Sequence, residues 1–228
     1  MTKRILFLGA DGVGKTHLML SIGKILSGLN NEVLLLDSSK RIYNYFTYNS
    51  DVENEIAATK DGTVREDMYI ASDINLIEEN KYDYILIEDN VGKNLNLQEF
   101  FKVFVVQNFD KDALMENKKI IQKYNNGVND FNNVHFIFNQ MLDTTSGKDF
   151  LLQELLSVLK NKTQIMNNED IEIEFNESDL VTASINKWNG NVRFKKYSPE
   201  FKQALYQITN IINEFDNKQF KKIIERRF

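Results

Sequence analysis

The sequence predicts an α/β fold in which a doubly wound, mostly parallel sheet is flanked by helices. Two observations predict it: short continuous apolar runs recur along the chain, and segments with helical spacing lie between them. Short apolar runs suit strands that are buried on both faces, and their alternation with helices is typical of parallel sheets. The expected strands are Ile5–Leu8, Val33–Leu36, Tyr84–Ile87, Val103–Val106, Val134–Phe138 and Ile171–Phe175.

Helices are expected between these strands. In the last of them, Pro199–Phe215, apolar residues recur every three or four positions, which gives one stripe that can lie on the sheet. Residues 44–71 show no clear period and are expected to form a long irregular insertion. The other expected helices are Thr16–Leu29, Ala113–Tyr124 and Asp149–Leu159.

The composition limits the classes of function. The 228 residues suit one α/β domain, and the hydrophobic fraction of 42% indicates a globular protein. The absence of cysteine excludes disulfides and thiolate metal sites, and the net charge of −5 argues against a broadly basic surface for nucleic acid. No apolar run approaches the roughly 20 residues that span a bilayer, so a cytoplasmic protein is expected.

One motif carries specific chemistry. The eight residues from Gly9 to Thr16 read Gly-Ala-Asp-Gly-Val-Gly-Lys-Thr, which fits the pattern G-x-x-x-x-G-K-[ST] between an expected strand and an expected helix. In such a loop glycines let backbone N–H groups surround an anion, and the helix start adds its positive dipole end. Lys15 would reach the outer phosphates, and Thr16 would offer a hydroxyl to Mg²⁺. The motif predicts a P-loop that holds the phosphates of ATP.

Further segments resemble the ParA/MinD family of P-loop ATPases, in the same order along the chain. Glu32–Asp37 resembles the family's second strand, which ends in aspartate, and Tyr82–Asp89 resembles its Walker B strand. Lys102–Gln107 resembles the next strand, and Phe136–Gln140 resembles the strand that ends in the adenine-reading asparagine, here Asn139. The resemblance implies a nucleotide-binding domain over residues 1–215.

The sequence also departs from the family pattern. The family's second, signature lysine, which reaches the partner's phosphates in a dimer, is replaced by Ala10. Asp37 is followed by two serines, so the later aspartate that orients the attacking water is missing, and Glu88 with Asp89 replaces the usual Walker B aspartate. Loss of a cationic finger can slow phosphoryl transfer by roughly 10³–10⁵-fold. At most a slow ATPase is expected, in an atypical branch of the family (TadZ/CpaE-like or small ParA-like).

The motif and the resemblance together imply the site residues and their ligands. The expected cofactors are ATP or ADP and Mg²⁺. Catalytic roles are expected for Lys15, Asp37 and Glu88, and Mg²⁺ coordination for Thr16, Asp37 and Glu88. Nucleotide-binding positions are expected at Gly9, Asp11, Gly12, Val13, Gly14, Lys15, Thr16, His17 and Asn139.

Three of these positions have a second interpretation. Asn139 can read adenine through its amide, or it can cap a turn at a strand end. The Asp11 carboxylate would repel phosphate, so it is expected to point to solvent, or else to meet a partner subunit or orient water. His17 directly follows the motif, and the rings of His17 and His135 are expected to pack as structural groups.

Residues 216–228 are expected to form a basic amphipathic C-terminal tail. From Lys218 to Phe228 there are five basic side chains and one acidic side chain. Phe220, Ile223 and Ile224 share one helical face with Phe228, a pattern that suits contact with an anionic membrane and resembles the membrane tail of MinD in character. Alternatively, the final helix packs on the domain and leaves its lysines in solvent.

The main functional hypothesis is an ATP-binding switch of the ParA/MinD type. It would form a homodimer and position a cargo such as pilus or secretion machinery, the division site or DNA. One alternative is a dimeric scaffold of the same fold that needs no nucleotide. Another is a plasmid or chromosome partition ATPase, although the acidic composition makes non-specific DNA a less favoured partner.

Overall fold

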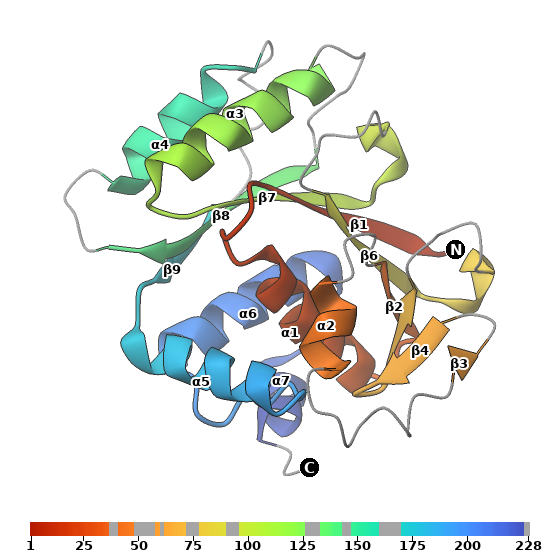
Figure 1. The fold of residues 1–228 in the computed structure, drawn as a ribbon. Coiled ribbons are helices and arrows are strands. Elements are labelled where there is room, and N and C mark those ends of the chain that lie inside the picture. Colours follow the sequence, from red (N-terminus) through yellow and green to blue (C-terminus); the bar gives the residue numbers. More distant parts are fainter. Residues whose placement is uncertain are drawn as a thin grey trace. The chain divides into compact units, whose positions relative to one another are not determined.

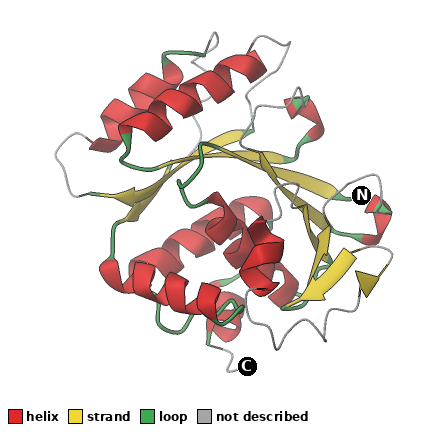
Figure 2. Cartoon of the chain, viewed as in Figure 1, coloured by secondary structure: helices red, strands yellow, loops and turns green. Residues whose placement is uncertain are grey.

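The computed structural model of the chain describes residues 1–36, 41–47, 58–59, 62–71, 78–89, 96–125, 133–142, 147–159 and 170–225. The predicted α/β fold is confirmed: seven of the described strands run parallel in a sheet that is flanked by helices (Figure 1, Figure 2). Contacts group the chain into two compact units. The first unit comprises Met1–Lys3, Thr16–Ile87 and Asn176–Phe228, and the second comprises Arg4–Lys15 and Glu88–Phe175.

The sheet of the first unit is covered by an almost fully buried helix. Strand β2 (Val33–Leu36) pairs in parallel with β5 (Met68–Ala71) and with β6 (Tyr84–Asp89). Helix α1 (Lys15–Gly28) approaches these strands through Gly23, where a Cβ would lie 2.8 Å from the sulfur of Met68. The buried apolar residues of α1 are Leu18, Met19, Leu20, Ile22, Ile25 and Leu26.

The prediction of an irregular insertion over residues 44–71 is wrong for the part that the structure describes. Strands β4 and β5 form an antiparallel hairpin, and the turn residues Glu66 and Asp67 have φ angles of 51° and 62°. Such turns usually contain glycine, and Glu66 and Asp67 therefore carry no local turn signal. Lys24 of α1 supports the turn instead, since its ammonium lies 2.9 Å from Glu66 Oε2 and 3.1 Å from Asp67 Oδ2. The elements in this range are the end of α2 (Arg41–Thr47), β3 (Ala58–Thr59), β4 (Gly62–Arg65) and β5.

Two C-terminal helices complete the first unit. Helix α6 (Pro199–Ile212) starts with the predicted proline, and its N-cap Ser198 accepts a hydrogen bond from the Phe201 N–H through its side chain. It ends before the predicted Phe215. Helix α7 (Asn217–Ile224) begins at a capping box formed by Asp216 and Gln219.

The apolar face of α7 packs inside the unit. Phe220 is buried and its ring centroid lies 5.3 Å from that of Tyr206. Ile223 is buried at the end of α1, where a Cβ on Gly28 would lie 2.9 Å from it. For residues 216–225 the packed alternative therefore describes the tail better than the membrane interpretation, and Arg226–Phe228 lie outside the described residues. None of the described helices has the length and apolar character needed to cross a membrane.

The second unit is a parallel sheet with two helices. Its strand order is β1-β7-β8-β9, and α3 (Lys111–Asn125) and α4 (Gly147–Leu156) lie together on one face of these strands (Figure 1). An ion pair of 2.7 Å between Lys118 and Glu154 joins the two helices. The predicted strands are confirmed with extended or slightly shifted ends, as β1 (Lys3–Leu8), β7 (Lys102–Gln107), β8 (Val134–Met141) and β9 (Ile171–Glu174). Short 3-10 turns, η3 (Glu79–Lys81) and η4 (Leu97–Glu99), precede β6 and β7.

Helix α5 (Glu177–Trp188) has no counterpart among the predicted elements. The residues that it buries are Asp179, Thr182 and Asn186, all of them polar. A search for apolar periodicity cannot find a helix whose inner face is polar.

Replacement of Asp67 by glycine is expected to stabilise the protein by about 0.5–1 kcal/mol, because a Cβ is strained in the left-handed region and glycine is not. The Asp67 side chain is 74% exposed, so its ion pair with Lys24 contributes little. Urea denaturation of the wild type and of Asp67→Gly measures the difference. A loss of stability would mean that the contact with Lys24 outweighs the strain.

Candidate phosphate-binding site

The predicted P-loop lies between β1 and α1. Gly9, Gly12 and Gly14 have φ angles of 147°, 80° and 97°, values that residues with a Cβ rarely adopt. Gly14 also has no room for a side chain, because a Cβ there would clash with the amide nitrogen of Asn139. The glycines of the motif are thus required by the backbone of this loop.

The ammonium group of Lys15 is buried at the loop. The side chain is 2% exposed, and Nζ donates hydrogen bonds to the carbonyl oxygens of Gly9 and Ala10, each at 2.6 Å. Oε1 of Glu88 lies 3.9 Å from the same nitrogen. A buried ammonium without such partners would cost several kcal/mol. The loop therefore holds one cation in a fixed place, with a carboxylate beside it.

Two adjacent carboxylates at the end of β6 have different surroundings. Side chains alternate between the faces of a strand, so Glu88 and Asp89 point to opposite sides. Glu88 lies beside Lys15, whereas Asp89 accepts a hydrogen bond of 2.6 Å from the hydroxyl of Tyr124 on α3. Burial, followed by the bond to this carboxylate, raises the pKa of Tyr124. Glu88 is therefore the carboxylate of this pair that lies at the loop.

A chain of side-chain amides holds the start of the loop. Ala10 is fully buried, and its N–H donates to Asn117 Oδ1 at 2.5 Å. The Asn117 amide nitrogen donates to the carbonyl of Val106 at 2.9 Å and to Gln107 Oε1 at 2.6 Å. The fully buried Gln107 donates in turn to the carbonyl of Asn108 at 2.6 Å. The backbone at Ala10 is thus tied to β7 and α3.

Neither Asn117 nor Gln107 is among the site residues that the sequence predicts. The buried residues of α3 include Ala113, Asn117, Ile120 and Tyr124, so Asn117 occupies a position on the apolar face of this helix. An asparagine at such a position, spaced three or four residues from apolar neighbours, is the signal that would have identified it.

Asn139 also contacts the loop. It lies within β8 and not at its end, so the strand-end turn does not describe it. Its amide nitrogen donates to the carbonyl of Val13 at 2.8 Å, and its side chain is buried. Asn139, the predicted adenine-reading residue, is therefore the second side chain that holds the loop backbone in place.

The remaining predicted residues have varied positions. Thr16 and His17 lie in the first turn of α1, and the His17 ring packs on Tyr197 and Phe201, with centroid distances of 5.6 Å and 5.5 Å. This is the structural packing expected for His17, and the buried His135 is likewise packed, on Phe104. Asp11 is exposed, as expected. Asp37, the expected catalytic residue and Mg²⁺ ligand, lies outside the described residues.

Solved structures share the fold over nearly the whole chain. MinD of Aquifex aeolicus superposes with a TM-score of 0.60 at 19% identity, over 94% of this chain and 98% of that one. The chain has the MinD/ParA fold. A plasmid partition protein of Borrelia burgdorferi bound to AMPPNP gives 0.55 at 19% identity, over 97% and 99% of the two chains. MinD of Pyrococcus horikoshii complexed with Mg-ADP gives 0.55 at 16% identity, over 96% and 99%.

No protein-family profile and no curated protein matches the sequence. At identities below 20% these structures establish the fold of the chain. The function has to be argued from the site itself.

Replacement of Asn117 by alanine is expected to lower the free energy of unfolding by about 2–4 kcal/mol. The change leaves the Ala10 N–H and Gln107 Oε1 buried without their partner, and each such group costs roughly 1–3 kcal/mol. Chemical denaturation of Asn117→Ala against wild type measures the loss. Glu116→Ala, an exposed neighbour on α3, is the matched control and should change little. Equal stability of the two variants would contradict a structural role for the amide.

Stability is expected to depend on the protonation of His17. Burial lowers the pKa of His17 from 6.5 to about 4, and the nearby carboxylate of Asp179 opposes this only in part. The unfolded chain therefore binds more protons, and stability falls as the pH drops from about 6.5 towards 4. The loss is on the order of 3 kcal/mol. Urea denaturation at both ends of this range should show a smaller loss for His17→Phe, and an equal loss in both proteins would contradict this.

Proposed function

We propose that the protein binds ATP with Mg²⁺ at the loop Gly9–Thr16 and acts as a MinD/ParA-like switch that positions a cellular cargo. The observation that supports binding is the buried Lys15 ammonium, with the Glu88 carboxylate 3.9 Å away. A loop whose backbone turns at glycines can surround phosphates, a cation can bind them, and a carboxylate can bind Mg²⁺. Together these groups fit a magnesium nucleotide. Two proteins of the same fold were solved with AMPPNP and with Mg-ADP.

Four side chains, those of Lys15, Thr16, Asp37 and Glu88, have chemical roles in this proposal. The Lys15 ammonium, which donates to the carbonyls of Gly9 and Ala10 in this structure, would bind the outer phosphate oxygens of the nucleotide. The hydroxyl of Thr16 and the carboxylates of Glu88 and Asp37 would be the protein's ligands for Mg²⁺, an ion that prefers oxygen. Mg²⁺ usually keeps several waters and binds substrate phosphates, so phosphate oxygens and water would complete its coordination.

Hydrolysis is proposed to be slow. Ala10 is fully buried and its N–H is bonded to Asn117, so this position offers no cation to a transition state. Asp37 is followed by serines where the family has its water-orienting aspartate. Phosphoryl transfer depends on positioning and on neutralising charge, and both are reduced here. Bound ATP would then persist and keep the protein in its ATP-bound state. In that state the protein would be a cytoplasmic homodimer that binds a protein cargo.

A second candidate is a dimeric scaffold that needs no nucleotide. The observation in its favour is that polar groups of the loop have hydrogen-bond partners within the protein. Lys15 donates to the loop's own carbonyls, and the amides of Asn117 and Asn139 bond to the loop backbone. A loop with this many internal bonds can keep its shape without a ligand.

Calorimetric titration of ATP with Mg²⁺ into the purified protein tests the proposal. Lys15→Ala is expected to weaken binding by roughly 10- to 150-fold, because a hydrogen bond to a charged group contributes about 1.5–3 kcal/mol. Lys118→Ala, which removes a lysine paired with Glu154, is the control and should bind as wild type. Absence of binding to the wild type would favour the scaffold, and turnover in the same samples would show whether hydrolysis is slow.

The adjacent carboxylates provide a second, matched comparison. Glu88→Gln is expected to abolish most of the Mg²⁺ dependence of ATP binding, because it removes the carboxylate at the loop. Asp89→Asn should keep that dependence, since Asp89 faces Tyr124. If both variants lose it equally, the assignment of Glu88 to the metal is wrong.

A further inference from the structure

The outward face of α5 carries four large apolar side chains, while the residues that the helix buries are polar. An ordinary surface helix shows the opposite pattern. The buried side chains are those of Asp179, Thr182 and Asn186. Large apolar side chains are exposed instead, with exposed fractions of 37% for Leu180, 53% for Val181, 42% for Ile185 and 67% for Trp188.

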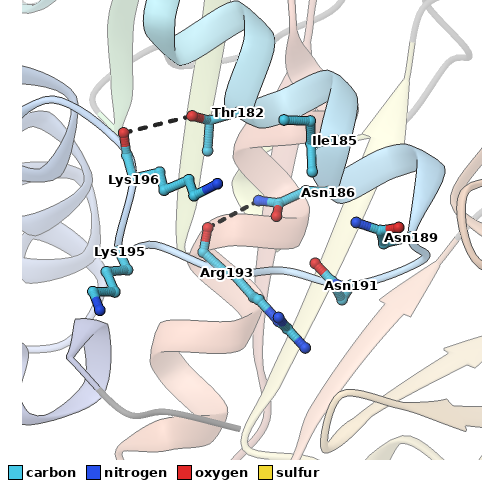
Figure 3. Close-up of a pocket in the computed structure, with 8 residues that line it drawn as sticks. All are labelled: Thr182, Ile185, Asn186, Asn189, Asn191, Arg193, Lys195 and Lys196. Atoms are coloured by element: carbon cyan, nitrogen blue, oxygen red, sulfur yellow. Dashed lines mark hydrogen bonds between the residues drawn. The ribbon is translucent and has the colours of Figure 1, made fainter.

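Hydrogen bonds fix α5 in this orientation. The carboxylate of Asp179 accepts hydrogen bonds of 2.6 Å from both the N–H and the hydroxyl of Ser198. The amide of Asn186 donates to the carbonyl of Arg193 at 2.9 Å, as Figure 3 shows, and to the hydroxyl of Tyr197 at 3.2 Å. Rotating the helix to bury its apolar residues would leave these groups unpaired, at roughly 1–3 kcal/mol each. The apolar stripe is therefore held outward.

The stripe is continuous along the helix. Val181, Ile185 and Trp188 are spaced by four and three residues, so they lie above one another on one face, with Leu180 beside them. A helix of 12 residues is about 18 Å long. Single exposed apolar residues are common on protein surfaces, whereas contiguous apolar patches mark interaction sites.

The two ends of the stripe carry opposite charge. Glu177 is exposed at the start of α5, and Lys187 is exposed near its end. Beside Ile185 lies a pocket of about 260 Å³ whose lining includes Arg193, Lys195 and Lys196 (Figure 3). The helix thus runs from an acidic end to a basic end, with apolar residues between.

We propose that α5 is a dimerisation surface that binds α5 of a second copy of this chain, antiparallel and without a requirement for nucleotide. A twofold axis brings the same patch of both copies together. In that arrangement Val181 of one copy packs near Ile185 of the other, and Glu177 of each copy faces Lys187 of the other. The same contact then buries the apolar stripe and pairs the two charged ends with opposite charges.

A second copy fits this surface better than an anionic membrane or nucleic acid. The basic end of α5 would attract such ligands, but Glu177 at the other end and the net charge of −5 would repel them, whereas a second copy supplies apolar surface and both signs of charge. One helix of this length covers less than the roughly 800 Å² per partner of a standard interface. A weak dimer is therefore expected, with a dissociation constant on the order of 10 µM.

Sedimentation equilibrium of the full chain without nucleotide tests the proposal. The wild type should be in monomer–dimer equilibrium, and Val181→Glu should weaken association at least about tenfold. Met115→Glu, which changes an equally exposed apolar residue on α3, is the control and should associate as wild type. Circular dichroism checks that each variant is folded. A wild type that is monomeric at roughly 100 µM, or variants that associate equally, would overturn the proposal.

A charge exchange tests the antiparallel arrangement. Glu177→Lys and Lys187→Glu should each weaken association, and the double variant should restore it, because opposite charges then face each other again. A double variant no better than the single ones would overturn the antiparallel register. Association is expected with and without ATP, so a dimer that forms only with ATP would overturn nucleotide independence. Calorimetric binding of ATP is a separate readout, which distinguishes failure of this surface from failure of the proposed nucleotide function.

Discussion

The second unit is organised around the buried positive charge of Lys15. An ion that leaves water costs several kcal/mol unless partners replace its hydration. Here the loop turns the carbonyls of Gly9 and Ala10 toward the ammonium, and β6 places Glu88 nearby. A backbone that curls around its own side chain in this way needs left-handed φ angles, which explains why glycine occupies the turning positions.

Two asparagines then determine how the loop is anchored. Asn117 reaches it from α3 and Asn139 reaches it from β8, and both bond to backbone groups of the loop. Their amides can donate and accept, so each can satisfy a backbone group and a further neighbour. The loop is held by the sheet and by a helix of the same unit, which limits the conformational entropy that a ligand would have to remove.

The sequence predicted those elements whose signal is local. The prediction of Val33–Leu36 as a strand matches β2, and Pro199 starts α6 as predicted. Both signals, an apolar run and a helix cap, consist of consecutive residues. The hairpin at Glu66 and Asp67 depends on a lysine that is distant in the sequence, and α5 buries polar residues, so neither gave a local signal. Within the site, the motif identified Lys15, whereas Asn117 became visible only through its bonds.

The pleat of β6 has a consequence for the comparison of related sequences. Position 88 points to the loop and position 89 points to Tyr124, so the two acidic residues are not interchangeable although they are neighbours. An aspartate at 88 would keep the correct side of the sheet with a shorter reach. An alignment that shifts this strand by one residue would match the wrong acid, one that the sheet turns away from the loop.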